Sequence, residues 1–556
     1  MIRNQKNRFA SMRYLVNYIL LVGSLFVLNS CSNQKKEAEG KTVFRYTASS
    51  SITSLDPAFA KDQDNIWGCI QLYNGLVQLD DELRVQPCIA KSWEILDSST
   101  TYIFHLRNDV FFHTDTLLPK NEIHPVKASD FVYSFNRLID PKVASPGSWV
   151  MNNVKRTEQG LLMIYAIDDT TLIIHLEKPF SPFPGLLTMP YCSVVPKNAV
   201  DFYGSDFRNH PVGSGPFKFS MWKEGVKLIF LKNEHYFERD SVEKKLPYLD
   251  AVEISFISDK QSAFIEFLKG NLDFISGIYA SYKDDLLTRH GNLQSKYAHR
   301  FKMETQPYLN TEYLGILSDR SATNPLQNKL VRQALNYGFD RRKMMKYLLN
   351  NIGTAATSGF IPPGLPSFDS TLVNGYDYNP SMARELLKEA GYPDGKGLPE
   401  INMSTTITYQ ELTEYIKSQW EEIGFKIKID VNQAAFHRKM VAEQKLPFFR
   451  GSWIADYPDA ENYLALFYSK NFAPAGPNFT HFSNAAFDAL YEKASVESTD
   501  SIRFGYYRQM DQIVMNEAPV VVLYYDKVLR LTQNNIEGLG SNAMNLLVLK
   551  KVRKKE

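Results

Sequence analysis

The sequence predicts an α/β fold made of several domain-sized units. The chain has 556 residues, and at about 150 residues per domain this length suggests three or four such units. A strand–helix–strand pattern between Ile401 and Val431 is typical of a parallel sheet with a right-handed crossover. Apolar residues make up 44% of the chain and charged residues 22%, a globular composition that disfavours wholesale disorder and a polytopic membrane protein.

The first 30 residues predict an export signal. Four basic residues accompany an apolar run from Tyr14 to Leu28, which is shorter than the roughly 20 residues that a membrane-spanning helix needs. Cys31 follows, and Leu28-Asn29-Ser30-Cys31 resembles the lipobox of bacterial lipoproteins, whose cysteine is acylated after cleavage. We expect a signal peptide over residues 1–30, a lipidated Cys31 and a flexible polar tether over residues 31–41, with an uncleaved anchor helix as the alternative.

Charge and cysteine content restrict the partners. Residues 1–30 carry four basic and no acidic residues, so their removal changes the formal net charge from +2 to −2. A nearly neutral chain lacks the basic footprint of a nucleic-acid-binding protein, and we expect no nucleic-acid partner. Cys69, Cys88 and Cys192 then remain, which permits one internal disulfide, although buried thiols are the expected state.

Two elements are predicted in the first half of the folded chain. Residues 102–106 alternate with period two, Asn108-Asp109 supplies a turn, and residues 110–113 follow, which predicts a β-hairpin. Ser129 and Asp130 are N-cap residues for a helix with Phe131, Phe135 and Leu138 on one face.

The second half predicts alternating helices and strands. A helix begins at Asn379-Pro380 and ends before Gly391, because asparagine caps a helix, proline suits its first turn and glycine follows its end. Further spacing predicts these elements in order: a strand at 401–405, a helix at 412–423, a strand at 425–431, a helix at 435–444 and a strand at 448–455.

Catalytic and metal-binding motifs are missing from the sequence. It contains no G-x-S-x-G, H-E-x-x-H, C-x-x-C or G-x-G-x-x-G pattern. His105 and His113 are the one pair considered for a metal, and on two arms of a hairpin they are expected to be ordinary strand residues. We therefore expect no enzymatic chemistry, cofactor or metal.

Several short motifs are spread along the chain. They are Ser54-Leu55-Asp56-Pro57, Leu72-Tyr73-Asn74-Gly75-Leu76-Val77, Ala90-Lys91-Ser92-Trp93-Glu94, Val212-Gly213-Ser214-Gly215-Pro216-Phe217, Val331-Arg332-Gln333-Ala334-Leu335, Ile361-Pro362-Pro363-Gly364 and Trp453-Ile454-Ala455-Asp456-Tyr457-Pro458-Asp459. Together these motifs resemble the family 5 extracellular solute-binding proteins, the oligopeptide- and dipeptide-binding components of ABC importers. The resemblance extends over about 500 residues in the order of the family.

The resemblance implies a type II periplasmic-binding-protein-like fold, in which two α/β lobes enclose a ligand cleft. Lobe one would comprise residues 42–307 and 526–556, with an extra subdomain near 82–189, and lobe two residues 308–525. The chain would cross between the lobes near Pro307–Thr311 and near Leu523–Asp526, and ligand binding would close the lobes.

The resemblance also implies the ligand-binding residues. Asp456 matches the aspartate that pairs with the α-ammonium of a peptide, because a carboxylate in a closed cleft needs a cation; helix capping is its alternative role. Ser452, Trp453 and Ile454 would lie on the strand that bonds the peptide backbone, with core packing as the alternative for Trp453. Arg450 would bind the carboxylate of the ligand or pair with an acid of the protein, and Tyr525 would lie at the second crossing.

These residues predict a lipid-anchored receptor in the cell envelope, facing the periplasm or the exterior. It would be a monomer that captures oligopeptides with a free α-amine and passes them to an ABC permease and its ATPase subunits. The alternatives are a nickel chelate, haem, glutathione or oligosaccharide as the solute, and a hydrolase on the same scaffold.

Overall fold

The computed structural model describes residues 41–48, 52–115, 124–277, 283–318 and 324–555. The predicted signal peptide, Cys31 and nearly all of the predicted tether lie outside these residues. In the described part of the chain, no helix has both the length and the apolar character needed to cross a bilayer.

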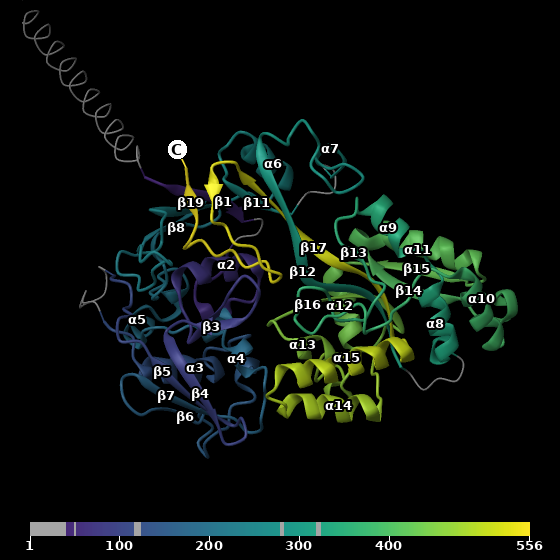
Figure 1. Ribbon diagram of the computed structural model, residues 1–556, viewed down its shortest axis with the longest axis horizontal. Coiled ribbons are helices and arrows are strands. Elements are labelled where there is room, and N and C mark those ends of the chain that lie inside the picture. The colour runs from purple at the N-terminus through teal and green to yellow at the C-terminus, as the bar shows by residue number, and fades with distance from the viewer. Residues whose placement is uncertain (1–40, 49–51, 116–123, 278–282, 319–323, 556) are drawn as a thin grey trace, which may run out of the picture.

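One eleven-stranded sheet runs through the molecule (Figure 1). Strand β13 (Thr354–Ala355) pairs with β17 beside the main path. The main path is β15 (Ile427–Asn432), β14 (Ile401–Thr406), β16 (Phe448–Ile454), β12 (Phe301–Ile316), β17 (Val520–Gln533), β11 (Phe274–Ser276), β1 (Val43–Ala48), β10 (Ala251–Phe256), β9 (Lys227–Lys232) and β8 (Phe217–Lys223).

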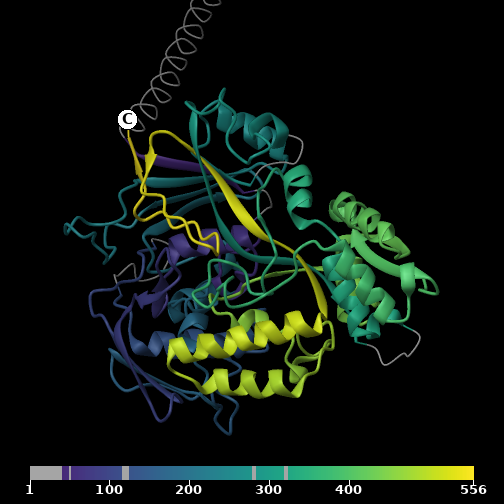
Figure 2. The same cartoon turned by 45° about the vertical axis from the view of Figure 1, so that its right-hand side comes forward.

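The long strands β12 and β17 connect the two lobes, as Figure 2 shows for the yellow β17. They pair in antiparallel register, with Pro307 opposite Lys527 and Thr311 opposite Tyr525. Between these pairs, three residues of β12 lie opposite the single residue Asp526, so the ladder is interrupted where the chain passes between lobes. The residue boundaries given above for the two lobes stay a prediction.

A four-stranded antiparallel sheet forms a separate layer in lobe one. Its order is β4 (Ala90–Leu96), β5 (Thr101–Leu106), β7 (Thr171–His175) and β6 (Ile164–Ala166). The predicted hairpin is wrong, because β5 pairs with β4 and β7, and residues 110–113 form only an isolated bridge between Phe111 and Pro125. Both edges of β5 are thus occupied by other strands.

His105 and His113 therefore do not lie on two arms of one hairpin. His105 contacts Glu94, whereas His113 is buried and its Nε2–H donates to the carbonyl of Gly215 at 3.0 Å. The Gly213-Ser214-Gly215-Pro216 turn packs so tightly that a Cβ at Gly213 would lie 2.0 Å from the carbonyl oxygen of Leu72. This turn therefore has a role in packing, which requires glycine.

The predicted strand–helix–strand unit is confirmed in lobe two. Helix α10 (Pro380–Glu389) begins after Asn379, whose side chain accepts a bond from the N–H of Met382. Strands β14 and β15 are parallel and are joined by α11 (Gln410–Glu422), and α12 (Ala434–Ala442) then leads to β16, which extends the same sheet. The helix expected near residues 129–138 is α3 (Ala128–Ile139), but its N-cap residue is Lys127 and not Ser129 or Asp130. Asp130 is the third residue of the helix, and its side chain accepts from the N–H of Lys127 at 2.9 Å.

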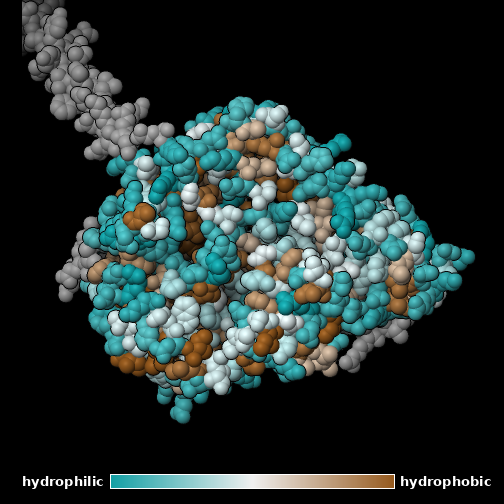
Figure 3. All heavy atoms as spheres, in the orientation of Figure 1, coloured by the Kyte–Doolittle hydropathy of each residue, from teal (hydrophilic) through white to brown (hydrophobic). Residues whose placement is uncertain are grey.

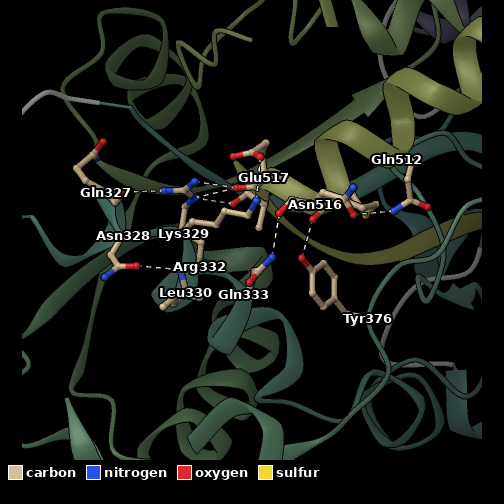
Figure 4. A network of polar contacts seen from close by, with 12 residues as sticks. Gln327, Asn328, Lys329, Leu330, Arg332, Gln333, Tyr376, Gln512, Asn516 and Glu517 are labelled. Atoms are coloured by element: carbon tan, nitrogen blue, oxygen red, sulfur yellow. Dashed lines mark hydrogen bonds and ion pairs between the residues drawn. The ribbon is translucent and has the colours of Figure 1, made fainter. Parts of the chain in front are cut away.

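Polar contacts at the end of α15 (Asp500–Glu517) join it to α8 (Lys329–Tyr337), as Figure 4 shows. Arg332 donates from Nε and Nη2 to the carbonyl of Glu517 at 3.1 and 2.8 Å, and Gln333 donates to the carbonyl of Asn516 at 2.9 Å. These donors satisfy carbonyls that a helix end leaves without partners, directly before β17 begins. The contact therefore orients the strand that leads to the lobe crossing.

The remaining described elements pack on these sheets. Cys69, Cys88 and Cys192 are buried free thiols. The view in Figure 3 shows a mainly hydrophilic face with scattered apolar groups. The further elements are α2 (Gln63–Leu72), α4 (Phe183–Leu186), α5 (Lys197–Tyr203), α6 (Lys260–Leu268), α7 (Lys283–Leu286), α9 (Arg341–Leu348), α13 (Glu461–Leu464), α14 (Ala485–Val496), β2 (Val77–Leu79), β3 (Val85–Pro87), β18 (Ile536–Glu537) and β19 (Arg553–Lys554).

Candidate functional site

Strand β16 carries four of the predicted site residues and has a free edge. Because side chains alternate along a strand, Arg450, Ser452 and Ile454 share one face and Trp453 lies on the other. The strand pairs with β12 over its whole length, but with β14 only at Phe449. Among the described residues, no second strand borders β16 beyond Phe449. The carbonyl of Arg450 accepts from His437 of α12 at 2.8 Å, so an extended ligand could add to the part of this edge that follows Arg450.

Asp456 follows β16 and has no ionic partner within the described residues. Its Oδ2 accepts a long hydrogen bond from Asn462 Nδ2 at 3.4 Å, and its carboxylate has no Lys, Arg or His nitrogen of the described chain within 4 Å. The side chain remains accessible to water, yet protein atoms surround it on most sides, and this loss of hydration raises the pKa of the carboxyl. A cation bound here would neutralise the negative charge of this carboxylate.

Asn462 holds Asp456 and Trp453 together. Its Oδ1 accepts from the backbone N–H of Asp456 at 3.1 Å and from the indole Nε1–H of Trp453 at 2.9 Å. The helix-capping alternative for Asp456 is wrong, because the next helix is α13 and its N-cap residue is Ala460.

Buried acids brace the loop that carries Asp456. Glu461 accepts hydrogen bonds from the hydroxyls of Tyr457 and Tyr491, and burial raises the pKa of Glu461 to about 7. Arg503 pairs with Asp459 at 3.4 Å. These contacts anchor the loop in lobe two.

Arg450 is paired with an acid of the protein. Its guanidinium forms a salt bridge with Glu312, which is 2% exposed, and the guanidinium carbon lies 3.4 Å from the centre of the Tyr409 ring. Burial raises the pKa of Glu312, although Arg450 opposes this shift. A ligand carboxylate at Arg450 would have to share it with Glu312, and such a contact stays a prediction.

The two residues at the second crossing differ in environment. Tyr525 is 2% exposed, and its hydroxyl donates to the carbonyl of Gly359 at 2.5 Å, inside lobe two and apart from the β16 group. Asp526 is half-buried, and its Oδ2 accepts from Asn310 Nδ2 at 3.3 Å. Tyr525 is placed as a core residue by these contacts, and its role in the cleft remains untested.

Lobe one faces Asp456 with aromatic residues. The rings of Trp149 and Tyr457 lie 6.4 Å apart. Burial, together with the negative charges of Asp456 and Asp62, raises the pKa of Tyr191 to about 12. Tyr457, the residue after Asp456, packs in the hydrophobic core cluster of lobe one, so Asp456 is at the surface where the two lobes meet.

The sequence reasoning did not identify Asn462, Glu312, Asp526 or Tyr191. Asn462 lies six residues after Asp456 and directly after Glu461, and no pattern in the sequence distinguishes it from its polar neighbours. Within the described part of the chain, no group of three or more His, Cys, Asp or Glu residues could hold a metal ion. A hollow of about 1380 Å³ beside the Asp56–Arg137 ion pair in lobe one is lined by none of the predicted site residues.

Two curated proteins are similar to most of the chain. Haem-binding protein A of Haemophilus influenzae is 28% identical over 467 residues, 81% of this chain and 80% of that protein. A glutathione-binding protein, GsiB of Shigella flexneri, is 27% identical and covers 88% of this chain and 90% of its own length.

Solved structures match nearly the whole fold. The periplasmic binding protein DppA from Helicobacter pylori, in complex with the peptide STSA, has a TM-score of 0.72 and 26% identity over 93% of this chain and 98% of that one. HbpA2 from Haemophilus parasuis has a TM-score of 0.80 and 23% identity, with 93% and 100% coverage. A family model described as bacterial extracellular solute-binding proteins, family 5 Middle, matches residues 84–474, and the chain belongs to this family.

Proposed function

We propose that the protein is a lipid-anchored receptor that binds oligopeptides by their free α-ammonium and delivers them to an ABC permease. The observation that carries this proposal is the carboxylate of Asp456, which has no basic partner among the described residues and lies where the lobes meet. An α-ammonium supplies one positive charge and three hydrogen-bond donors, so it can both neutralise such a carboxylate and bond to its oxygens.

The free edge of β16 supports a peptide rather than a free amine. Backbone N–H and C=O groups of an extended ligand pair with an open strand edge whatever its side chains are. The similarity to a binding protein in complex with the peptide STSA supports a peptide as the ligand.

Other solutes of the family fit these charges less well. One relative is a haem-binding protein and another a glutathione-binding protein. The carboxylates of haem would meet Asp456, Asp526 and a Glu312–Arg450 pair that is already neutral. The side chains here favour a ligand with a positive charge.

Cys31 would tether the receptor to a bacterial membrane, with its cleft facing the periplasm or the exterior, and it would act as a monomer without catalysis.

Calorimetric titration tests this proposal. The chain from residue 32 is unfolded and refolded to remove bound ligand, then titrated with tri- to pentapeptides and with their N-acetylated forms. We expect binding to be lost on acetylation and to fall about 30-fold or more in Asp456→Asn, because removing one member of a buried ion pair costs about 2–5 kcal/mol. Asp377→Asn, an exposed acid of lobe two, is the matched control. Equal binding of acetylated peptides would exclude recognition of the amine.

A further inference from the structure

The backbone groups of β16 alternate between its two edges. In an antiparallel pair, the N–H and C=O of one residue point to the same side, and those of the next residue point to the other. The carbonyl of Arg450 accepts from His437, which also bonds Ser404 of β14, so this carbonyl points away from β12. The N–H of Ala455 donates to the carbonyl of Leu309 in β12 at 2.9 Å, which fits the alternation.

Two residues of β16 offer backbone groups at the free edge. Ser452 and Ile454 are in phase with Arg450, so their N–H and C=O groups point away from β12. No other strand of the described chain borders them. Ser452 is half-buried and Ile454 is 50% exposed. Each residue therefore has one donor and one acceptor that an extended peptide can pair.

His437 of α12 closes this edge at Arg450. A carbonyl can only accept, so the ring carries its hydrogen on Nε2, which donates to Arg450 at 2.8 Å. Nδ1 then accepts from the hydroxyl of Ser404 at 3.3 Å, and the Ser404 oxygen accepts from Asn432 Nδ2 at 3.0 Å. Burial lowers the pKa of His437, which favours the neutral ring that these two bonds need. The imidazole is thus fixed through both nitrogens.

The imidazole lies at the end of the space that a ligand strand would occupy. Strand β14 borders β16 on the same side, but it pairs only at Phe449, through Ser404. A peptide on the free edge therefore takes the place in the sheet that β14 takes farther along β16. It runs toward the end of β14, and His437, which is 4% exposed and bonded to both strands, lies between them.

The length of the open edge limits the length of the ligand. Residues 451–455 lie between Arg450, which His437 occupies, and Asp456, the proposed site of the α-ammonium. Residues of an antiparallel strand advance by about 3.4 Å each, so this edge is about 17 Å long. A paired ligand strand advances by the same distance per residue. About five ligand residues therefore fit beside the edge.

We propose that His437 ends the peptide-binding edge, so that the receptor takes extended peptides of up to about five residues and discriminates against longer ones. The inference rests on the proposed function, in which the α-ammonium occupies Asp456, and it adds the length of the substrate. A sixth residue meets the imidazole. To pass it, the peptide must either displace His437 from Arg450 or lift off the edge near Ser452 and lose backbone bonds there.

The test compares peptides that differ only in length. Peptides of alternating alanine and threonine, from two to eight residues, are titrated into the refolded protein by calorimetry. We expect the pentapeptide to bind at least about tenfold tighter than the heptapeptide, because the longer chain loses hydrogen bonds at the edge.

Variants assign the limit to the imidazole. In His437→Ala, the ratio of the heptapeptide to the pentapeptide dissociation constant should fall below about threefold. His437→Gln keeps a donor for the carbonyl of Arg450 and should keep most of the ratio. His481→Ala is the matched control, because the Nε2 of His481 bonds the carbonyl of Ala473 at 3.0 Å elsewhere in lobe two. A general loss of stability lowers both affinities and leaves the ratio unchanged. Thermal unfolding checks that the variants fold, and the length series in the unaltered protein stands without them.

Two results would overturn the inference. Equal affinity for pentapeptide and heptapeptide in the unaltered protein would exclude a length limit at this edge. A ratio that stays the same in a folded His437→Ala would place the limit elsewhere. If both lengths bind equally and N-acetylation abolishes binding of each, this inference fails while the proposed function stands; if no peptide of any length binds, both fail.

Discussion

Trp453 donates its indole N–H to Asn462 Oδ1 at 2.9 Å, and this bond joins the binding strand to the helix beyond the Asp456 loop. The same oxygen accepts the backbone N–H of Asp456. Asn462 is buried, and it acts on a ligand through these two neighbours. It is a positioning residue for the proposed amine site.

We predict that Asn462→Ala weakens peptide binding about tenfold although it removes no ligand contact. The loss follows because the carboxylate of Asp456 is then free to leave the productive position. Calorimetry measures the affinity, and tryptophan fluorescence in the unliganded protein reports the changed indole environment. Asn402→Ala, on the exposed side of β14, is the control. An unchanged fluorescence spectrum with full affinity would contradict this role.

The Arg450–Glu312 pair gives a stability prediction. Both side chains are largely buried, so removal of one leaves an uncompensated charge. Glu312→Gln should lower the free energy of unfolding by about 3–5 kcal/mol, and the double variant Glu312→Gln with Arg450→Met should recover part of it. Denaturant titration measures these values. The exposed pair Arg342–Asp377 should contribute about 0–1 kcal/mol, and a similar loss at both pairs would contradict the argument.

Glu461 gives a pH prediction with a definite sign. Its pKa in the folded protein is about 7, above the ordinary value of 4.5, so the folded state binds its proton more tightly than the unfolded state. Its contribution to stability is present below pH 4.5 and is lost as the pH rises through 7. The free energy of unfolding should fall between about pH 5 and 8, and Glu461→Gln should make that fall smaller.

A surface acid separates this effect from general charge repulsion. Lys470 lowers the pKa of Glu492, so Glu492→Gln should leave the slope between pH 5 and 8 unchanged. Asp511, whose pKa is also raised to about 7 by burial, supplies the slope that remains in Glu461→Gln. A slope that is identical in the wild type and Glu461→Gln would exclude Glu461 as its source.

Local patterns in the sequence predict the elements of lobe two but not the charge partners of its site. Asn379-Pro380 and the 3.6-residue period mark α10 without any tertiary information, and β14, α11 and β15 follow equally well. The predicted hairpin at residues 102–113 is wrong. Alternation of apolar residues predicts a half-buried strand but does not indicate which strands pair with it.

The same limit applies to the site. Asp456 was found through the family resemblance, and its place beside β16 agrees with the structure. Glu312 lies 138 residues before Arg450 and meets it only because β12 and β16 are neighbours in the sheet. Asp526 lies opposite three residues of β12, and no pattern in the sequence predicts this irregularity in the ladder.

Ser181 provides the last prediction, because it bonds one lobe to the other. Its N–H donates to the carbonyl of Ser495 at 3.1 Å and its hydroxyl to the carbonyl of Glu497 at 2.7 Å, at the end of α14. Ser181→Ala removes the second bond and keeps the first. One neutral hydrogen bond contributes about 1 kcal/mol, so ligand affinity should fall about fivefold, mainly through faster dissociation from a less stable closed form. Stopped-flow dissociation of a peptide measures this rate, with the exposed Ser418→Ala as the control. A dissociation rate unchanged in Ser181→Ala would show that this contact does not limit opening of the lobes.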